Sequence, residues 1–239
     1  MRLVSRRFIV LACTVVLTGG IAAGCFPQTE VRWQHTPVRG YSELWPEQLA
    51  EYVAAIYWIS GGEVGGCGTT APYRAAVPVG TLARYFVDEG NAQNIRGDIA
   101  FAQSILETGW FSFPDCGQVR PWYNNFGGIG ETDGGSGTPG QFPTAQIGVR
   151  AQIQRLNRYA NPAGAESLAQ PLVPQKGWST ASQYNNWWHG VQGTKTIWQS
   201  LTGTWATSPC YDYRVLKIYN QMRTHYGLAP MPVAGSATC

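Results

Sequence analysis

The feature that most constrains the fold is a helical pattern that ends at Glu107 and is soon followed by a glycine-dense segment. Apolar residues recur at helical spacing from Ile95 to Thr108, which predicts a helix with one buried stripe. Glu107 lies one step round from that stripe, at the edge of the predicted core. Seven glycines then occur within residues 126–140, too many for a helix interior. We expect that segment to form either a hairpin or a mobile lid beside Glu107.

Other segments show the same amphipathic spacing, and a glycine or proline follows each of them. Helices are predicted at about residues 44–60, 78–89, 149–160 and 213–226. Residues 162–193 lack periodicity and are expected to wrap the outside as irregular chain. A chain of 239 residues without internal repeats suits one core. The predicted fold class is therefore mainly α, with one domain over residues 41–228.

The first 24 residues have the form of an export signal. Three arginines precede an uncharged stretch whose strongly apolar part, Phe8–Leu17, is too short to span a bilayer. Ala22-Ala23-Gly24 then lead into Cys25, which resembles the lipobox of bacterial lipoproteins, where the cysteine is acylated. We expect either a lipid anchor at Cys25 or plain secretion with cleavage nearby. Residues 25–40, polar and without periodicity, are predicted to be a tether.

Removal of the leader changes the charge argument. Residues 1–24 hold three arginines and no acid, so the formal net charge falls from +3 to 0, with 14 basic and 14 acidic residues. A neutral mature protein has no net field that would attract nucleic acid or an anionic surface. The sequence also lacks a Lys/Arg run, metal-spaced histidines and a phosphate-cradling Gly-Lys loop. We therefore expect no nucleic acid, no metal and no cofactor, and a monomeric protein.

The cysteines point to an oxidising location. Cys13 leaves with the leader and Cys25 would carry the lipid, and an even set of four then remains. These four are Cys67, Cys116, Cys210 and Cys239. Such a set in an exported chain predicts two disulfides, whose pairing the sequence leaves open. A bridge to Cys239 would fix the loose C-terminal tail, residues 229–239.

A carboxylic acid at a helix end beside aromatic rings is typical of a cleft that hydrolyses glycosides. The reaction needs an acid that protonates the leaving oxygen, and burial raises a carboxyl pKa toward neutrality. Glu107 fits that role. Glu131 and Asp133 are candidates for the second carboxylate, although Asp133-Gly134 is also an ordinary turn pair. The Trp110 ring would either stack on sugar or pack against the core.

Four ordered blocks of sequence resemble the bacterial endo-beta-N-acetylglucosaminidase family, glycoside hydrolase family 73. The likeness extends from Val79 to Tyr219. The blocks are Arg96-Gly-Asp-Ile-Ala-Phe-Ala-Gln-Ser-Ile-Leu-Glu-Thr-Gly-Trp-Phe, Asn124-Asn-Phe-Gly-Gly-Ile-Gly, Gly148-Val-Arg-Ala-Gln-Ile-Gln-Arg-Leu and Trp205-Ala-Thr-Ser-Pro-Cys-Tyr. The resemblance implies a lysozyme-like α fold and an enzyme that cuts peptidoglycan.

The resemblance also implies roles for individual residues. It implies that Glu107 is the general acid, that Tyr211 lines the site, and that Asn124, Asn125 and Phe126 shape the cleft floor. The two asparagines can bond sugar hydroxyls or the acetamido group, but asparagine pairs also cap helices. Tyr211 precedes an amphipathic helix, where a buried ring is equally expected. If neither loop acid acts, the N-acetyl group of the substrate or an activated water would replace the second carboxylate.

The expected function is an exported peptidoglycan hydrolase that cleaves the beta-1,4 bond after N-acetylglucosamine in glycan strands. It would act at the outer face of a bacterial membrane, in the periplasm or in the cell wall, anchored through Cys25. One alternative is a muramidase or lytic transglycosylase, which shares the lysozyme-like fold and the single helix-end glutamate. Another is a non-catalytic wall-binding protein that keeps the aromatic cleft without turnover.

Overall fold

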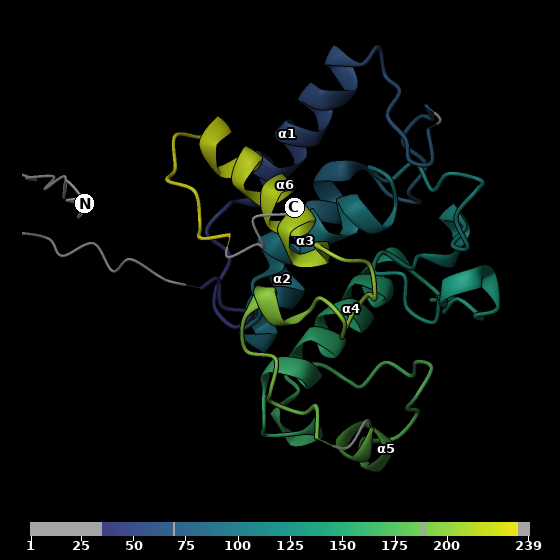
Figure 1. Cartoon of the computed structure of the whole chain (residues 1–239), viewed down its shortest axis with the longest axis vertical. Helices are drawn as coiled ribbons and strands as arrows, with labels where there is room; N and C mark the ends of the chain where they lie inside the picture. The colour runs from purple at the N-terminus through teal and green to yellow at the C-terminus, as the bar shows by residue number, and fades with distance from the viewer. Residues whose placement is uncertain (1–34, 69, 188–189, 234–239) are drawn as a thin grey trace, which may run out of the picture. The chain divides into compact units, whose positions relative to one another are not determined.

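A computed structural model describes residues 35–68, 70–187 and 190–233, and these residues are predominantly helical. Within these ranges the chain forms no named β-strand, only isolated bridges such as Arg39 with Ile95. The predicted mainly α class is confirmed. The α-helices are α1 (Pro46–Ile59), α2 (Val79–Gln93), α3 (Gly97–Glu107), α4 (Ala145–Ala160), α5 (Ala181–Asn186) and α6 (Tyr211–His225) (Figure 1).

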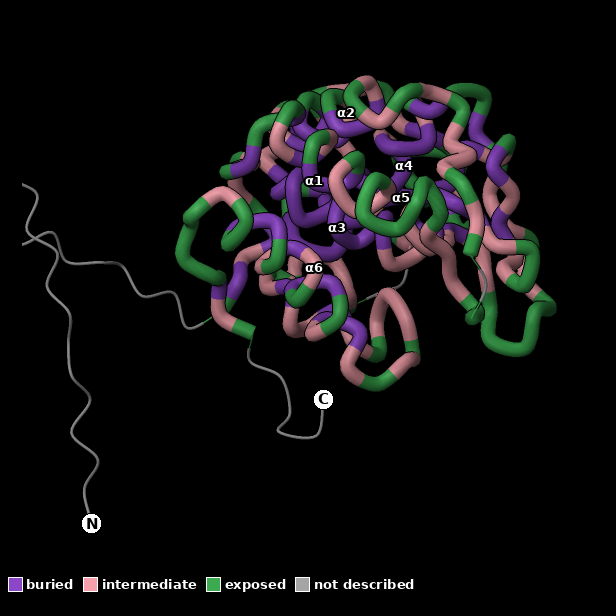
Figure 2. The backbone as a smooth tube through the Cα atoms, turned by 90° about the horizontal axis from the view of Figure 1, so that it is seen from above, coloured by how far each residue is buried: buried purple, intermediate pink, exposed green. Residues whose placement is uncertain are grey.

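Helix α3 is the core of the domain. Every residue from Gly97 to Ile105 is buried, and α1, α2, α4 and α6 all contact this helix. Figure 2 shows buried backbone along α3, with exposed segments concentrated in the outer loops. A helix so enclosed can hold its last residue in a fixed position, and that residue is Glu107.

The contact between α2 and α3 explains a wrong helix boundary. The sequence pattern placed the end of the second helix at Gly90, but α2 continues to Gln93 and ends at Asn94, which adopts the left-handed conformation. A Cβ on Gly90 would lie 2.6 Å from the Cα of Gly97, so the glycine permits close helix packing rather than a cap. Asn94 supplies the cap because its short polar side chain tolerates positive φ.

The segment predicted to be irregular, residues 162–193, contains a 3-10 turn at Ala165–Ser167 and the short helix α5 among its described residues. Thr180 caps α5, because its side chain accepts from the backbone N–H of Gln183 and the Gln183 side chain bonds back. Tyr184 on α5 and Trp178 before it are buried, with ring centroids 5.1 Å apart. The aromatic rings here therefore form a packed layer against α4, where the Tyr184 hydroxyl donates to the backbone oxygen of Gln154.

Packing begins before the predicted domain start at residue 41. Thr36 and Val38 are fully buried, and the backbone of Val38 bonds Thr196 and Arg96. These residues belong to the folded body and not to a tether, since their apolar and polar groups have partners within it. The predicted leader and Cys25 lie outside the described residues. At the other end, Met231 is buried and bonded to Asn220, so the tail is held at least to that point.

One disulfide is formed between described residues, joining Cys67 and Cys116 across a separation of 49 residues. Cys210 is also disulfide-bonded. In the described part of the chain no helix has the length and apolar character needed to cross a membrane. No group of three metal-ligating side chains occurs in that same part.

Candidate active site

A left-handed turn places Glu107 at the end of α3. Gly109, Trp110 and Phe111 all have positive φ, so the chain reverses hand directly after the helix. The Thr108 hydroxyl holds this turn, because it donates to the Ser104 oxygen at 2.6 Å and accepts from the Phe111 N–H at 2.9 Å. Such conformations cost free energy and persist only where the surroundings over-determine them. The burial of Phe111 in the core provides that constraint.

The Glu107 carboxyl lies among protein atoms although the side chain as a whole is only partly buried. Burial raises the pKa of Glu107 to about 8, and the nearby charge of Glu131 adds to the rise. Hydrogen bonding from Tyr211 and the Trp205 indole opposes it, since both favour the carboxylate. The net result is a carboxyl that holds its proton near neutral pH.

The glycine-rich segment forms a loop with a 3-10 turn at Asp133–Gly135 and no strand or β-bridge, so the hairpin alternative is wrong. Its arms approach so closely that a Cβ on Gly130 would lie 2.4 Å from the Thr138 oxygen. Gly128 has a φ of +63°, and a Cβ there would lie 2.8 Å from Oε2 of Glu107 and 3.6 Å from Cδ of Glu131. The loop therefore brings a second carboxyl to the same point as Glu107.

The two loop acids have different surroundings. Glu131 is half-buried, and burial raises its pKa above the ordinary value. Asp133 is exposed in a short turn, and its Oδ2 accepts from the Thr207 hydroxyl at 2.5 Å. Of these two acids, only Glu131 contributes to the raised pKa of Glu107. Asp133 thus matches the alternative that the sequence left open, an acid that serves a turn.

A small polar pocket of about 80 Å³ lies beside this pair of carboxyls. It is lined by the loop from Gly127 to Glu131 and by Arg155, Tyr159 and Trp205. The Arg155 guanidinium stacks on the ring of Trp178 at 4.9 Å and on that of Trp187 at 4.5 Å. The aromatic layer around α5 thereby fixes a cation at the wall of the pocket.

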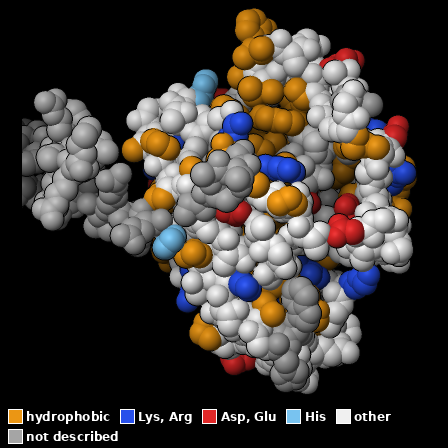
Figure 3. All heavy atoms as spheres, in the orientation of Figure 1, with side chains coloured by type: hydrophobic (Ala, Val, Ile, Leu, Met, Phe, Trp, Pro, Cys, Tyr) orange, Lys and Arg blue, Asp and Glu red, His pale blue; other side chains and the backbone are white. Residues whose placement is uncertain are grey.

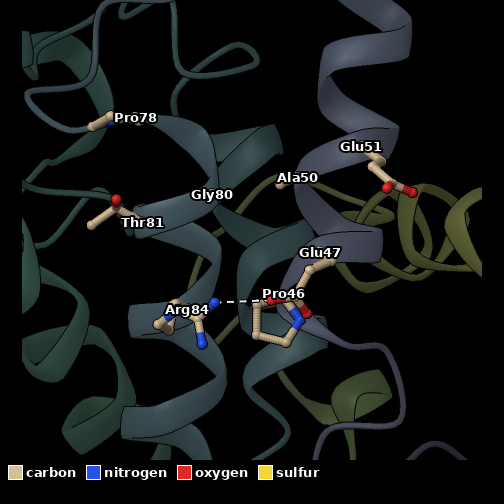
Figure 4. Close-up of a pocket in the computed structure, with 8 residues that line it drawn as sticks. All are labelled: Pro46, Glu47, Ala50, Glu51, Pro78, Gly80, Thr81 and Arg84. Carbon is tan, nitrogen blue, oxygen red and sulfur yellow. Dashed lines mark hydrogen bonds and ion pairs between the residues drawn. The ribbon is translucent and has the colours of Figure 1, made fainter.

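A larger groove of about 490 Å³ lies between α1 and α2, away from these residues (Figure 4). Both acids that line it have partners: Glu47 is paired with Arg84 at 2.9 Å, and Oε2 of Glu51 accepts from the Tyr226 hydroxyl at 3.4 Å. On the face drawn in Figure 3, hydrophobic side chains gather over α1. Trp58 and Ile59, at the end of that helix, are 84% and 73% exposed. Chemistry and geometry both favour the smaller pocket as the reactive centre.

The asparagines and Phe126 serve the loop and the core in this structure. Asn125 is fully buried, donates to the oxygens of Ile129 and Gly140, and accepts from the N–H of Ile129. Asn124 is buried and donates to the Phe142 oxygen at 3.0 Å. Phe126 is fully buried among other phenylalanine rings. These side chains hold the cleft wall, and any contact of theirs with sugar stays a prediction.

Tyr211 joins the site from α6, whose first residue it is. Its hydroxyl donates to Oε1 of Glu107, and its role in catalysis stays a prediction. Trp110 packs against the core and stacks with Tyr52, with ring centroids 6.3 Å apart. Trp205 lies in the last of the four sequence blocks, but the sequence predicts no role for it. Its indole N–H donates to the Gly127 oxygen at 3.1 Å.

Comparisons with known proteins agree with this geometry. A family model named Glucosaminidase, described as mannosyl-glycoprotein endo-beta-N-acetylglucosaminidase, matches residues 83–224. An uncharacterized protein of Borreliella burgdorferi is 31% identical over 141 residues. That alignment covers 59% of this chain and 61% of the relative, so the match spans less than two thirds of the relative's length. No solved structure gives a significant match. The matched region contains the end of α3, the glycine-rich loop and Tyr211.

Proposed function

Because this chain belongs to the glucosaminidase family, we propose that it hydrolyses the glycan strands of peptidoglycan with Glu107 as the proton donor. The observation that carries the proposal is the place of that carboxyl, at the end of α3 and beside both Glu131 and a polar pocket. Burial beside a polar pocket raises its pKa to about 8, so most of it is protonated at neutral pH. A general acid works best when its pKa lies near the working pH, and it must reach the leaving oxygen of the substrate.

In this mechanism Glu131 is the second carboxylate. It lies across Gly128 from Glu107, where a methyl group on the glycine would contact both acids. A second carboxylate activates water or stabilises the positive charge that develops on the sugar ring. Its position on a loop allows it to adjust as the strand binds. Asp133 has no part in this proposal, since it bonds Thr207 and is exposed.

The bond cleaved is, in this proposal, the beta-1,4 bond after N-acetylglucosamine. The description of the matching family supports this choice, because it names an endo-beta-N-acetylglucosaminidase. Peptidoglycan lies outside the cytoplasm, which agrees with the export signal expected from residues 1–24. We further propose that Cys25 carries a lipid that holds the enzyme at the membrane surface.

The proposal is tested with Glu107→Gln on purified cell wall. The amide keeps the size of the side chain and still accepts a bond from Tyr211, but it cannot donate the required proton. We expect release of soluble fragments to fall about 10²- to 10⁴-fold. Glu63→Gln makes the same chemical change at an exposed position and should leave the rate unaltered. Activity of the Glu107 variant near that of the wild type would refute the assignment.

A further inference from the structure

A chain of hydrogen bonds runs behind Glu107 through side chains that the proposed mechanism does not use. The Tyr211 hydroxyl donates to Oε1 of Glu107 and accepts from Nε2 of Gln103 at 2.7 Å. Oε1 of Gln103 in turn accepts from Nε2 of Gln152 at 2.8 Å. Gln103 and Gln152 are fully buried and Tyr211 is nearly so. Three helices, α3, α4 and α6, therefore meet in a buried polar chain that ends on the carboxyl.

The direction of these bonds follows from one backbone carbonyl. The oxygen of Ala100 accepts from Nε2 of Gln152 at 3.2 Å, and a carbonyl oxygen can only accept. The Gln152 amide must therefore turn its NH2 group toward Ala100 and Gln103, while its oxygen faces the Ser104 hydroxyl at 2.9 Å, which also lies 3.0 Å from the Ala100 oxygen. This orientation makes Gln103 present its oxygen to Gln152 and its own NH2 group to Tyr211.

The consequence for the carboxyl is a preferred position for its proton. The Tyr211 hydroxyl has one proton and its oxygen already accepts from Gln103, so the proton points to Oε1 of Glu107. Reversing the direction of these hydrogen bonds would leave buried polar groups without partners, which costs free energy. A protonated Glu107 therefore carries its acidic proton on Oε2. That oxygen lies toward Gly128 and the glycine-rich loop.

We propose that Gln103 is a positioning residue, which acts through Tyr211 to hold the transferable proton of Glu107 on the oxygen that faces the loop. This inference rests on the proposed function, because it takes Glu107 as the proton donor. The other titratable and charged groups near the carboxyl come from the loop and from α4. Glu131 faces Glu107 directly, while Tyr159 acts on Tyr211 and Arg155 lines the adjoining pocket.

The variant Gln103→Met tests the proposal, because it removes the amide and keeps the approximate volume. The Tyr211 hydroxyl would no longer be held as a donor and would accept the Glu107 proton in part of the population. The neutral carboxyl then gains a partner, so its pKa rises further. We expect kcat to fall about tenfold with KM within about twofold of the wild type. The basic limb of the pH–rate profile should move upward by about half a unit or more.

Gln154→Met is the matched control. Gln154 lies on α4 and is fully buried like Gln103, but its side chain bonds the backbone of Pro171 and Val173 and takes no part in the hydrogen bonds behind Glu107. It should lose thermal stability and keep the wild-type pH profile. If Gln103→Met fails to fold, Gln152→Met frees the Gln103 amide to rotate and should shift the profile in the same direction. An unshifted pH–rate profile in folded Gln103→Met or folded Gln152→Met overturns the proposal.

A readout without turnover separates this proposal from the proposed function. The Glu107 carboxyl is titrated by carbon-13 NMR in wild type, Gln103→Met and Tyr211→Phe. Both variants should raise the midpoint, and adding Gln103→Met to Tyr211→Phe should raise it no further, because Gln103 acts only through the hydroxyl. Additive shifts, or an unchanged midpoint in Gln103→Met, refute the positioning role. Lack of wall hydrolysis by the wild type refutes the proposed function and leaves the titration result standing.

Discussion

The raised pKa of Glu107 implies that this side chain destabilises the folded protein at alkaline pH. The folded protein binds the proton more tightly than the unfolded chain, so the free energy of unfolding falls as pH rises from about 4.5 to about 8. At about 1.4 kcal/mol per pKa unit, that interval gives an upper limit of about 5 kcal/mol. Because the side chain is partly exposed and water reaches it, we expect a cost of about 1–2 kcal/mol.

Glu107→Gln should remove this cost. The amide is neutral at every pH and its oxygen can still accept from Tyr211, so the variant should be about 1–2 kcal/mol more stable than the wild type at pH 9. At pH 4 both proteins carry a neutral side chain and should agree within about 0.5 kcal/mol. Denaturant unfolding at the two pH values, with Glu63→Gln as control, measures the difference. An equal effect of the Glu107 change at pH 4 and pH 9 would show that the carboxyl is not desolvated.

Three further outcomes are expected. Gly128→Ala should lower wall hydrolysis about tenfold or more, because its Cβ would lie 2.8 Å from Oε2 of Glu107. Gly134→Ala is the control, because Gly134 has the same left-handed backbone but no atom within 4 Å of its Cβ position. An equal loss of activity in Gly134→Ala would show that backbone strain, and not the contact with Glu107, is the cause. Glu131→Gln should abolish most activity and move the basic limb of the pH–rate profile to lower pH, since it removes a charge that raises the pKa of Glu107. Asp133→Asn should keep the wild-type activity and pH profile. A larger loss of activity in Asp133→Asn than in Glu131→Gln would exchange the roles of the two acids. Replacing both Cys67 and Cys116 with serine should lower the free energy of unfolding by up to about 4 kcal/mol, and an unchanged denaturation midpoint would contradict a native bridge.

The end of α3 was predictable from the sequence because its periodicity is strong. The position of Glu107 at the end of this helix follows from helical spacing, but the predicted single buried stripe is wrong, because α3 is buried on every side from Gly97 to Ile105. Gln103 lies one helical turn before Glu107 on the same face, so the same geometry offered a signal for it. What the sequence could not supply was its partner, since Gln152 and Tyr211 reach it from helices far along the chain.

The errors arose where tertiary packing overrides a local rule. Glycine is common at helix ends, but Gly90 lies inside α2, where the absence of a side chain lets Gly97 approach closely. The Asn125 amide bonds the loop backbone because a buried amide needs partners, and its contact with sugar stays a prediction. The choice between Glu131 and Asp133 depended on how a glycine-rich loop closes, which composition does not determine.

Mass analysis of the fragments released from purified peptidoglycan tests the central claim most directly. The account predicts fragments with N-acetylglucosamine at the reducing end, produced by the wild type and lost in Glu107→Gln. Fragments ending in N-acetylmuramic acid or its anhydro form would identify a muramidase or a lytic transglycosylase. Glycan binding without any released fragment would identify a wall-binding protein and contradict the account.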